Sequence, residues 1–209
     1  SQTIVAFGDS ITDAWRLNEY FPDADYINRG ISGQITGEML GRFKADVVDL
    51  KPEAVVILAG TNDLARGTTP AAVESNNEML ADIASAGKIK VILASLLPVS
   101  DYHKADNPAN ERTPQRPPAS ILAINERLKA FATQRGYTYL DYHAATVDER
   151  GQFKEDLSDD GLHPNGKGYR VMAPLVTAAI NKVLAPETPA QQQQQQQKRR
   201  SFPLFGAGK

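Results

Sequence analysis

Short apolar runs alternate with amphipathic segments along the chain. Five of these runs have the length and composition of buried strands, and they cover residues 4–7, 26–29, 54–59, 90–95 and 137–140. Near-continuous apolar strands that alternate with helices are typical of a parallel sheet covered on both faces. The pattern predicts an α/β fold: a doubly wound, three-layer α/β/α sandwich with a five-stranded, mostly parallel sheet in flavodoxin-like order.

Four segments between and after these strands carry apolar residues at helical spacing. One of them begins well at Thr69-Pro70, because a capping residue precedes proline at the first helical position. The faces expected to be buried are, in chain order, Met39, Leu40, Phe43, Val47 and Leu50; Val73, Leu80 and Ile83; Ile121, Ile124, Leu128 and Phe131; and Tyr169, Met172, Val176, Ile180 and Val183. The last helix should run from about Asn165 to Leu184 and close a domain over residues 1–184.

Composition narrows the function classes. The 209 residues include 41% hydrophobic and 23% charged residues with a formal net charge of −2, so the chain lacks the basic balance of nucleic-acid-binding proteins. No apolar run approaches the length of a membrane span. The absence of cysteine excludes disulfides, a thiolate nucleophile and cysteine-ligated zinc. His103 and His143 have no partners at metal-ligand spacing, so neither a metal nor a cofactor is expected.

Polar or glycine positions follow four of the five predicted strands. Ser10 comes after the first strand, Gly33 after the second and Asn62 after the third, and the segment from Asp160 to His163 follows the fifth. Because the carboxyl ends of parallel strands meet at one rim, where ligands bind in such folds, these residues should lie together.

These residue types suit nucleophilic catalysis. A serine hydroxyl needs a neighbouring imidazole to take its proton, and a carboxylate must orient that imidazole. Ser10, His163 and Asp160 can fill these three roles, with Asp159 as the alternative acid. Taken singly, Ser10 could also be a helix N-cap, Gly33 a position with positive φ, Asn62 a turn residue and His163-Pro164 a helix entry. Asp9 and Asp63 are expected to fix loops by hydrogen bonds.

Four motifs in this order resemble the SGNH (GDSL-type) hydrolases over roughly residues 4–184. The motifs are Gly8-Asp9-Ser10, Arg29-Gly30-Ile31-Ser32-Gly33, Gly60-Thr61-Asn62-Asp63 and Asp160-x-x-His163-Pro164. Ile11, where the family has leucine, is the one departure. The resemblance implies that Ser10, Asp160 and His163 are catalytic and that the backbone N–H groups of Ser10 and Gly33 and the side-chain amide of Asn62 form an oxyanion hole.

The resemblance also implies the reaction, which is hydrolysis of carboxylic esters through an acyl-serine intermediate. The small chain without an evident large apolar lid favours short-chain acyl or acetyl esters of small molecules or carbohydrates. The long polar loop from Ser100 to Ala119 follows the fourth strand and is a candidate wall of the substrate pocket. Its side chains Tyr102, Arg112 and Arg116 are candidate substrate-binding residues, and so is Trp15, whose alternative role is packing.

The last 25 residues, 185–209, differ in character from the domain. A linker over residues 185–189 precedes seven glutamines at 191–197 and a basic and apolar end over 198–209. This composition favours a flexible tail; a contact with a neighbouring subunit and an artificial extension are the alternatives. The sequence starts at Ser1, as after removal of a signal peptide or trimming, and a secreted or periplasmic location is expected over a cytoplasmic one.

Three functions compete for this sequence. The first is a serine esterase, and the second is a catalytically silent module on the same fold that binds an acylated glycan or a small ligand. In the third, the domain is a scaffold and the tail is the functional element. Ser10, Asn62, Asp160 and His163 are all present, which favours the esterase.

Overall fold

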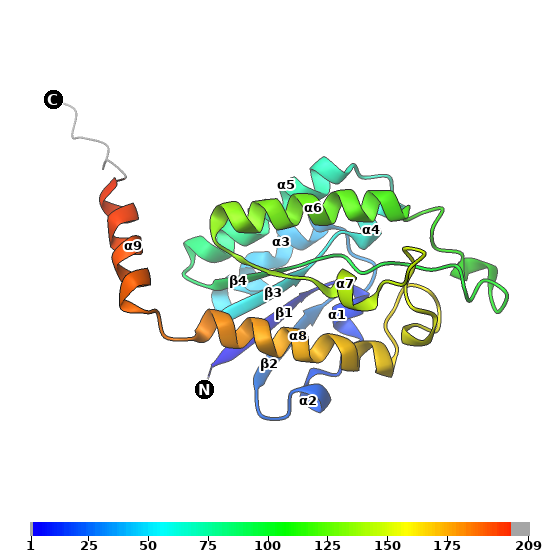
Figure 1. Cartoon of the computed structure of the whole chain (residues 1–209), viewed down its shortest axis with the longest axis horizontal. Helices are drawn as coiled ribbons and strands as arrows, with labels where there is room; N and C mark the ends of the chain where they lie inside the picture. The colour runs from blue at the N-terminus through cyan, green and yellow to red at the C-terminus, as the bar shows by residue number, and fades with distance from the viewer. Residues whose placement is uncertain (1, 202–209) are drawn as a thin grey trace.

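The computed structural model describes residues 2–201 and contains one five-stranded sheet (Figure 1). The strands are β1 (Thr3–Gly8), β2 (Asp25–Gly30), β3 (Ala54–Leu58), β4 (Lys90–Ala94) and β5 (Thr138–Leu140). Their order is β2-β1-β3-β4-β5, and every neighbouring pair is parallel. The predicted α/β/α class and flavodoxin-like order are therefore confirmed.

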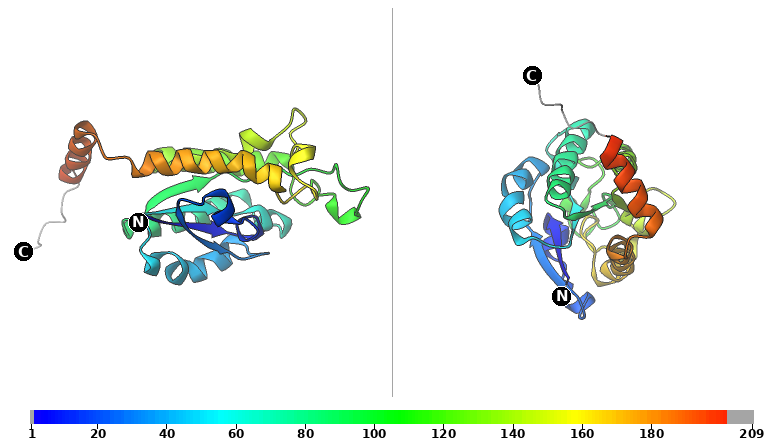
Figure 2. Two further views of the ribbon diagram at one scale, coloured as in Figure 1. Left: turned by 90° about the horizontal axis from the view of Figure 1, so that it is seen from below. Right: turned by 90° about the vertical axis from the view of Figure 1, so that its left-hand side faces the viewer.

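Helices cover both faces of this sheet (Figures 1 and 2). The α-helices are α1 (Ser10–Asp13), α2 (Leu17–Tyr20), α3 (Thr36–Asp46), α4 (Thr61–Ala65), α5 (Pro70–Ala86), α6 (Pro118–Arg135), α7 (Tyr142–Thr146), α8 (Gly166–Leu184) and α9 (Pro189–Ser201). Helix α5 packs between α3 and α6 on one face, while α1 packs against β1 and β2, and α8 against β4 and β5, on the other. Short 3-10 turns cover Val48–Leu50, Pro108–Asn110 and Glu155–Leu157.

The core lies at the centre of the sheet, where the strands predicted to be buried are buried in the structure. All five residues of β3 are buried, as are five of the six in β1. Burying a valine or isoleucine side chain contributes roughly 1.5–3 kcal/mol, so the two central strands anchor the domain. The loops at their carboxyl ends, which carry Ser10 and Asn62, are therefore attached to well-packed strands.

Two predicted helical faces need correction. Ile83 of α5 is 44% exposed, because α5 buries the face that carries Val73, Leu80 and Ala84 instead. Asn77 lies on that buried face, where its Nδ2 donates to the carbonyl of Ala59. Leu50 is 36% exposed, because α3 ends at Asp46 and a separate 3-10 turn follows it.

The tail forms a helix beyond the sandwich. Helix α9 follows α8 after a short link and lies outside the three layers, and it contains the glutamine run (Figures 1 and 2). Glu187 in the link accepts a hydrogen bond from Gln195 and lies 3.9 Å from Lys90 of β4. The predicted boundary at 184 coincides with the end of α8, while the division into domain and tail stays a prediction. The apolar stretch 202–205 lies outside the described residues.

Within residues 2–201, no helix combines the length and the apolar character that crossing a membrane requires.

Candidate active site

The serine lies at the first turn after the central strand β1. Asp9 caps α1 by accepting the N–H of Ile11 at 2.9 Å, so Ser10 is the first residue of the helix rather than its cap. Its hydroxyl Oγ lies 3.0 Å from Nε2 of His163. The two residues are separated by 153 positions in the sequence, and the rim of the sheet brings them together as expected.

The acid and the base lie on a single tight turn before α8. Asp160 Oδ2 is 2.6 Å from Nδ1 of His163, and its Oδ1 accepts the N–H groups of Leu162 and His163 at 2.8 Å. Burial raises the pKa of Asp160, but the hydrogen bonds from the His163 ring and from these two amides outweigh burial and hold the pKa well below its usual range. Asp159 instead accepts a hydrogen bond from Asn165, so Asp160 is the residue placed to orient the imidazole.

Gly161 allows this turn to sit against the loop after β4. Its φ is +80°, and a Cβ there would lie 2.4 Å from the carbonyl oxygen of Ser100. The Ser100 N–H donates to the Gly161 carbonyl at 2.9 Å. The Ser158 hydroxyl donates to the His163 carbonyl at 2.7 Å. The imidazole is thus carried on a backbone that is fixed from two directions.

Gly33 and Asn62 come from the loops after β2 and β3, and these loops touch. The Asn62 Nδ2 donates to the carbonyl of Gln34 at 3.0 Å. Arg66, at the end of α4 after β3, donates to the carbonyl of Gly33 at 2.9 Å. Gly33 has φ +80° with open space where a Cβ would be. Its N–H meets no hydrogen-bond acceptor within the described part of the chain, and one hydrogen of Asn62 Nδ2 also stays available.

Asp9 and Asp63 are almost fully buried next to these groups. Burial raises the pKa of Asp9 to about 6, against the lowering effects of the Ile11 N–H and of the charges of His163 and Arg116. Burial also raises the pKa of Asp63, whose carboxylate binds the backbone and hydroxyl of Thr36. Both residues fix loops by hydrogen bonds, in line with the expectation from sequence.

The four candidate substrate-binding side chains contact protein groups. The Tyr102 hydroxyl donates to Asp148. Trp15 is 5% exposed and its indole stacks on Tyr169 with ring centroids 5.0 Å apart, which corresponds to the packing alternative. The guanidinium of Arg112 donates to the carbonyl of Asp160 at 3.0 Å.

Arg116 is also only 5% exposed and binds Thr61 and Asn62. Both arginines of the long loop are predicted to bind substrate, but the sequence gives no indication that Arg112 contacts the Asp160 segment and Arg116 the Asn62 segment. The only signal was their position in a loop at the active rim, because their partners lie 48 to 55 residues away in sequence.

The other histidines lie apart from this constellation. Burial lowers the pKa of His143, and its backbone N–H donates to the Ser95 hydroxyl at 2.9 Å. His103 Nε2 lies 3.1 Å from the carbonyl oxygen of Glu155. Across residues 2–201, histidine and carboxylate side chains form no group of three that could hold a metal ion.

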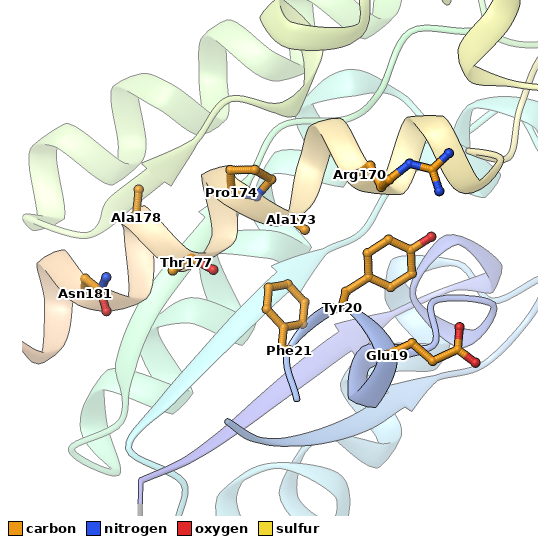
Figure 3. A pocket seen from close by; sticks show the side chains of 9 residues that line it. All are labelled: Glu19, Tyr20, Phe21, Arg170, Ala173, Pro174, Thr177, Ala178 and Asn181. Atoms are coloured by element: carbon orange, nitrogen blue, oxygen red, sulfur yellow. The ribbon is translucent and has the colours of Figure 1, made fainter. Parts of the chain in front are cut away.

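A groove runs along the outer side of α8 (Figure 3). It has a volume of about 770 Å³ and lies between α8 and the segment around α2. Its lining residues are Glu19, Tyr20, Phe21, Arg170, Ala173, Pro174, Thr177, Ala178 and Asn181. None of them is a predicted catalytic or oxyanion-hole residue.

Comparison with known proteins shows which family the chain is similar to. The model of the GDSL-like Lipase/Acylhydrolase family matches residues 6–171. An esterase, TesA of Pseudomonas aeruginosa, is 28% identical over 178 residues, which cover 78% of this chain and 80% of that protein. An arylesterase of Vibrio mimicus is 23% identical over 198 residues, or 88% of this chain and 90% of that protein.

A solved structure extends the likeness to three dimensions. The crystal structure of a GDSL-like lipase from Bacteroides thetaiotaomicron superimposes with a TM-score of 0.79 at 35% identity. The match covers 88% of this chain and 89% of that one.

Proposed function

The chain belongs to the GDSL-like lipase/acylhydrolase family, and from that premise we propose that it is a serine esterase. It would hydrolyse short-chain acyl or acetyl esters of small molecules or carbohydrates through a covalent acyl-serine intermediate. The observation that carries the proposal is the unbroken series from the Ser10 hydroxyl through the His163 ring to the Asp160 carboxylate. Its two links measure 3.0 and 2.6 Å.

This series gives the first chemical step. His163 Nε2 accepts the Ser10 proton as Oγ attacks the ester carbonyl, and the imidazolium then donates that proton to the leaving alcohol. Asp160 fixes the tautomer that leaves Nε2 free to act as base and stabilises the imidazolium that forms. In the second step the same nitrogen takes a proton from a water molecule as its oxygen attacks the acyl carbon. The bond from that carbon to Oγ then breaks, the acid is released, and the imidazolium returns the proton to Ser10 Oγ.

The negative oxygen that develops in both steps needs donors fixed in advance. We assign this role to the backbone N–H groups of Ser10 and Gly33 and to Nδ2 of Asn62. The Ser10 N–H is at the start of α1, where the helix dipole also favours negative charge. The free N–H of Gly33 and the second hydrogen of Asn62 support the assignment. Removing one such donor typically lowers kcat by about 10²- to 10³-fold.

The test is turnover of p-nitrophenyl acetate, butyrate and octanoate by the wild type and by Ser10→Ala. Ser75→Ala on the exposed side of α5 is the matched control. We expect fastest turnover of the acetate or butyrate, loss of turnover in Ser10→Ala, and wild-type rates in Ser75→Ala. A mass increase on the Ser10 peptide after treatment with a fluorophosphonate would identify the nucleophile. Equal hydrolysis by wild type and Ser10→Ala would overturn the proposal.

Two finer points belong to the same proposal. Acetylated sugars added to the panel would decide between a carbohydrate and a simple alcohol as the leaving part. The secreted or periplasmic location is not required by the chemistry, and fractionation of the producing cell tests it.

A further inference from the structure

We propose that Arg116 is a positioning residue that fixes the orientation of the Asn62 side-chain amide in the oxyanion hole. The inference rests on the proposed function, because it assigns a role to the residue that orients one of the three donors. It also explains why an arginine is buried at this point of the long loop between β4 and α6.

The guanidinium of Arg116 is held against the start of α4. Its Nε donates to the carbonyl oxygen of Thr61 at 3.0 Å and lies 3.1 Å from the Thr61 hydroxyl. Its Nη2 donates to Oδ1 of Asn62 at 3.1 Å. One rigid, planar group therefore binds both the backbone that precedes Asn62 and the amide of Asn62 itself.

The partners of the Asn62 amide allow only one of its two orientations. Oδ1 faces Arg116, which has donors and no acceptor, and Nδ2 faces the carbonyl oxygen of Gln34, which can only accept. Rotating the amide by half a turn would oppose N–H to N–H on one side and oxygen to oxygen on the other. Of these two partners, Arg116 alone carries a charge, and its donors make the flipped state costly.

The same contact makes the amide a better donor. A cation bonded to the carbonyl oxygen draws electron density away from the amide nitrogen, so the free N–H of Nδ2 binds a developing anion more strongly. The charge is kept in this buried place partly by Asp9, whose carboxylate attracts it, while burial and the neighbouring charge of Arg112 oppose it and lower the pKa of Arg116.

The test is a double-mutant cycle between Arg116→Met and Asn62→Ala, read as kcat and KM for p-nitrophenyl acetate. Methionine keeps the unbranched stem and removes every donor. We expect Arg116→Met to lower kcat about tenfold in the wild-type background, with KM changed less than about twofold. That is a part of the roughly hundredfold loss expected for Asn62→Ala. In the Asn62→Ala background, the same substitution should change kcat by less than about twofold.

Non-additivity is the readout that a merely structural role would not produce. A loop that Arg116 only stabilised would slow both backgrounds by the same factor, and that result would overturn the inference. An Arg116→Met enzyme with wild-type kcat would overturn it as well. Arg127→Met, which removes a surface ion pair between α6 and Glu74 of α5, is the control and should leave kcat unchanged.

Two further measurements keep the outcomes distinct. Arg116→Lys retains a charge and a donor and should recover part of the lost kcat; it replaces Arg116→Met in the cycle if the latter does not fold, and equal losses in both backgrounds again overturn the inference. Wild-type kcat in Asn62→Ala alone would remove the oxyanion role of Asn62 from the proposed function and the role of Arg116 with it. Equal losses from Arg116→Met in both backgrounds would overturn only the role of Arg116 and would leave the oxyanion role of Asn62 in place.

Discussion

The Asp63 carboxylate joins the loop after β3 to the loop after β2 through a single residue, Thr36. Its Oδ1 accepts the Thr36 N–H at 2.9 Å and its Oδ2 accepts the Thr36 hydroxyl at 2.6 Å, both out of contact with solvent. Asn62 precedes Asp63, and Gly33 lies three positions before Thr36. This buried pair of hydrogen bonds, together with the bond from Asn62 Nδ2 to the Gln34 carbonyl, fixes the distance between two of the proposed oxyanion donors.

Replacing Asp63 by alanine should affect stability and catalysis together. The substitution leaves the buried Thr36 N–H without its acceptor, so we expect the free energy of unfolding to fall by about 2 kcal/mol. The kcat for p-nitrophenyl acetate should fall at least about tenfold, because the Gly33 loop loses its buried attachment to the loop after β3. Urea denaturation and turnover measure the two effects. Asp106→Ala, at a side chain 78% exposed, should change neither; a stable and fully active Asp63→Ala enzyme would contradict the prediction.

Gly33→Ala should lower kcat strongly while lowering the free energy of unfolding only modestly. Alanine at φ +80° is strained by about 1–2 kcal/mol, although its methyl group would meet open space. The strain is relieved by rotating the peptide, which turns the N–H away from the oxyanion. Gly67→Ala is a close match, since Gly67 has φ +81° and equally open surroundings. Both variants should lose similar free energy of unfolding, and only Gly33→Ala should lose turnover. Equal kcat values in the two variants would count against Gly33 as a donor.

Asp160→Asn should lower kcat, because His163 loses the group that orients it, and should also make the free energy of unfolding less sensitive to acid. We expect kcat to fall by about 10³- to 10⁴-fold, because asparagine favours the wrong imidazole tautomer. The pKa of Asp160 is lowered in the folded chain, so its ionised form stabilises the fold above the unfolded value near pH 4. That contribution is lost as pH falls through the folded value.

Denaturation between pH 2 and 6 tests this sign. The wild type should lose free energy of unfolding relative to Asp160→Asn as the pH falls below about 4. Asp159→Asn is the adjacent control, with kcat near that of the wild type. A difference between wild type and Asp160→Asn that stays constant with pH would contradict the assigned pKa direction.

Asp9→Asn should show the opposite pH dependence in a different window. Its pKa is raised from 3.8 to about 6 in the folded chain by burial, so the folded state binds the extra proton between these values. The contribution of Asp9 to stability is therefore greatest below about pH 4 and is lost as the pH rises through about 6. Asparagine keeps the capping oxygen for Ile11 and has no charge.

We expect Asp9→Asn to gain stability relative to the wild type between pH 4 and pH 7, by on the order of 3 kcal/mol. Thermal denaturation across this range measures it, with Asp106→Asn as the exposed control. A flat difference across the range, or a loss for Asp9→Asn as the pH rises, would show that Asp9 is not protonated in this way.

Much of the fold and the position of the site followed from local patterns. The apolar runs at β1 and β3 are nearly uninterrupted, and the residues after parallel strands share a rim whatever the loops do, so Ser10 and His163 were expected together. The prediction that Ile83 is buried is wrong, because spacings of three and four residues fit more than one face of a helix. The polar residue Asn77 is buried on the true inner face, and an apolar pattern cannot indicate it.

The roles of Arg112 and Arg116 could not be predicted for a different reason. A loop without periodicity gives no indication of where its side chains point, and the partners of these arginines come from elements far away along the chain. The same holds for Thr36 and Asp63, which are 27 positions apart. Their pairing depends on how two loops close over the rim, and this is decided by tertiary packing.

The turn that carries Asp160 and His163 together makes the proposed active site dependent on the completion of folding. The proposed acid and base lie within four consecutive residues, Asp160 to His163, whereas the proposed nucleophile comes from the opposite end of the domain. A chain that is still emerging from the ribosome presents Ser10 long before Asp160 and His163 are synthesised, and a chain whose last segment has come loose separates the two groups again. Under the proposed function, hydrolysis reports on whether the first and last segments of the domain are joined, so that turnover would assay the intact protein directly.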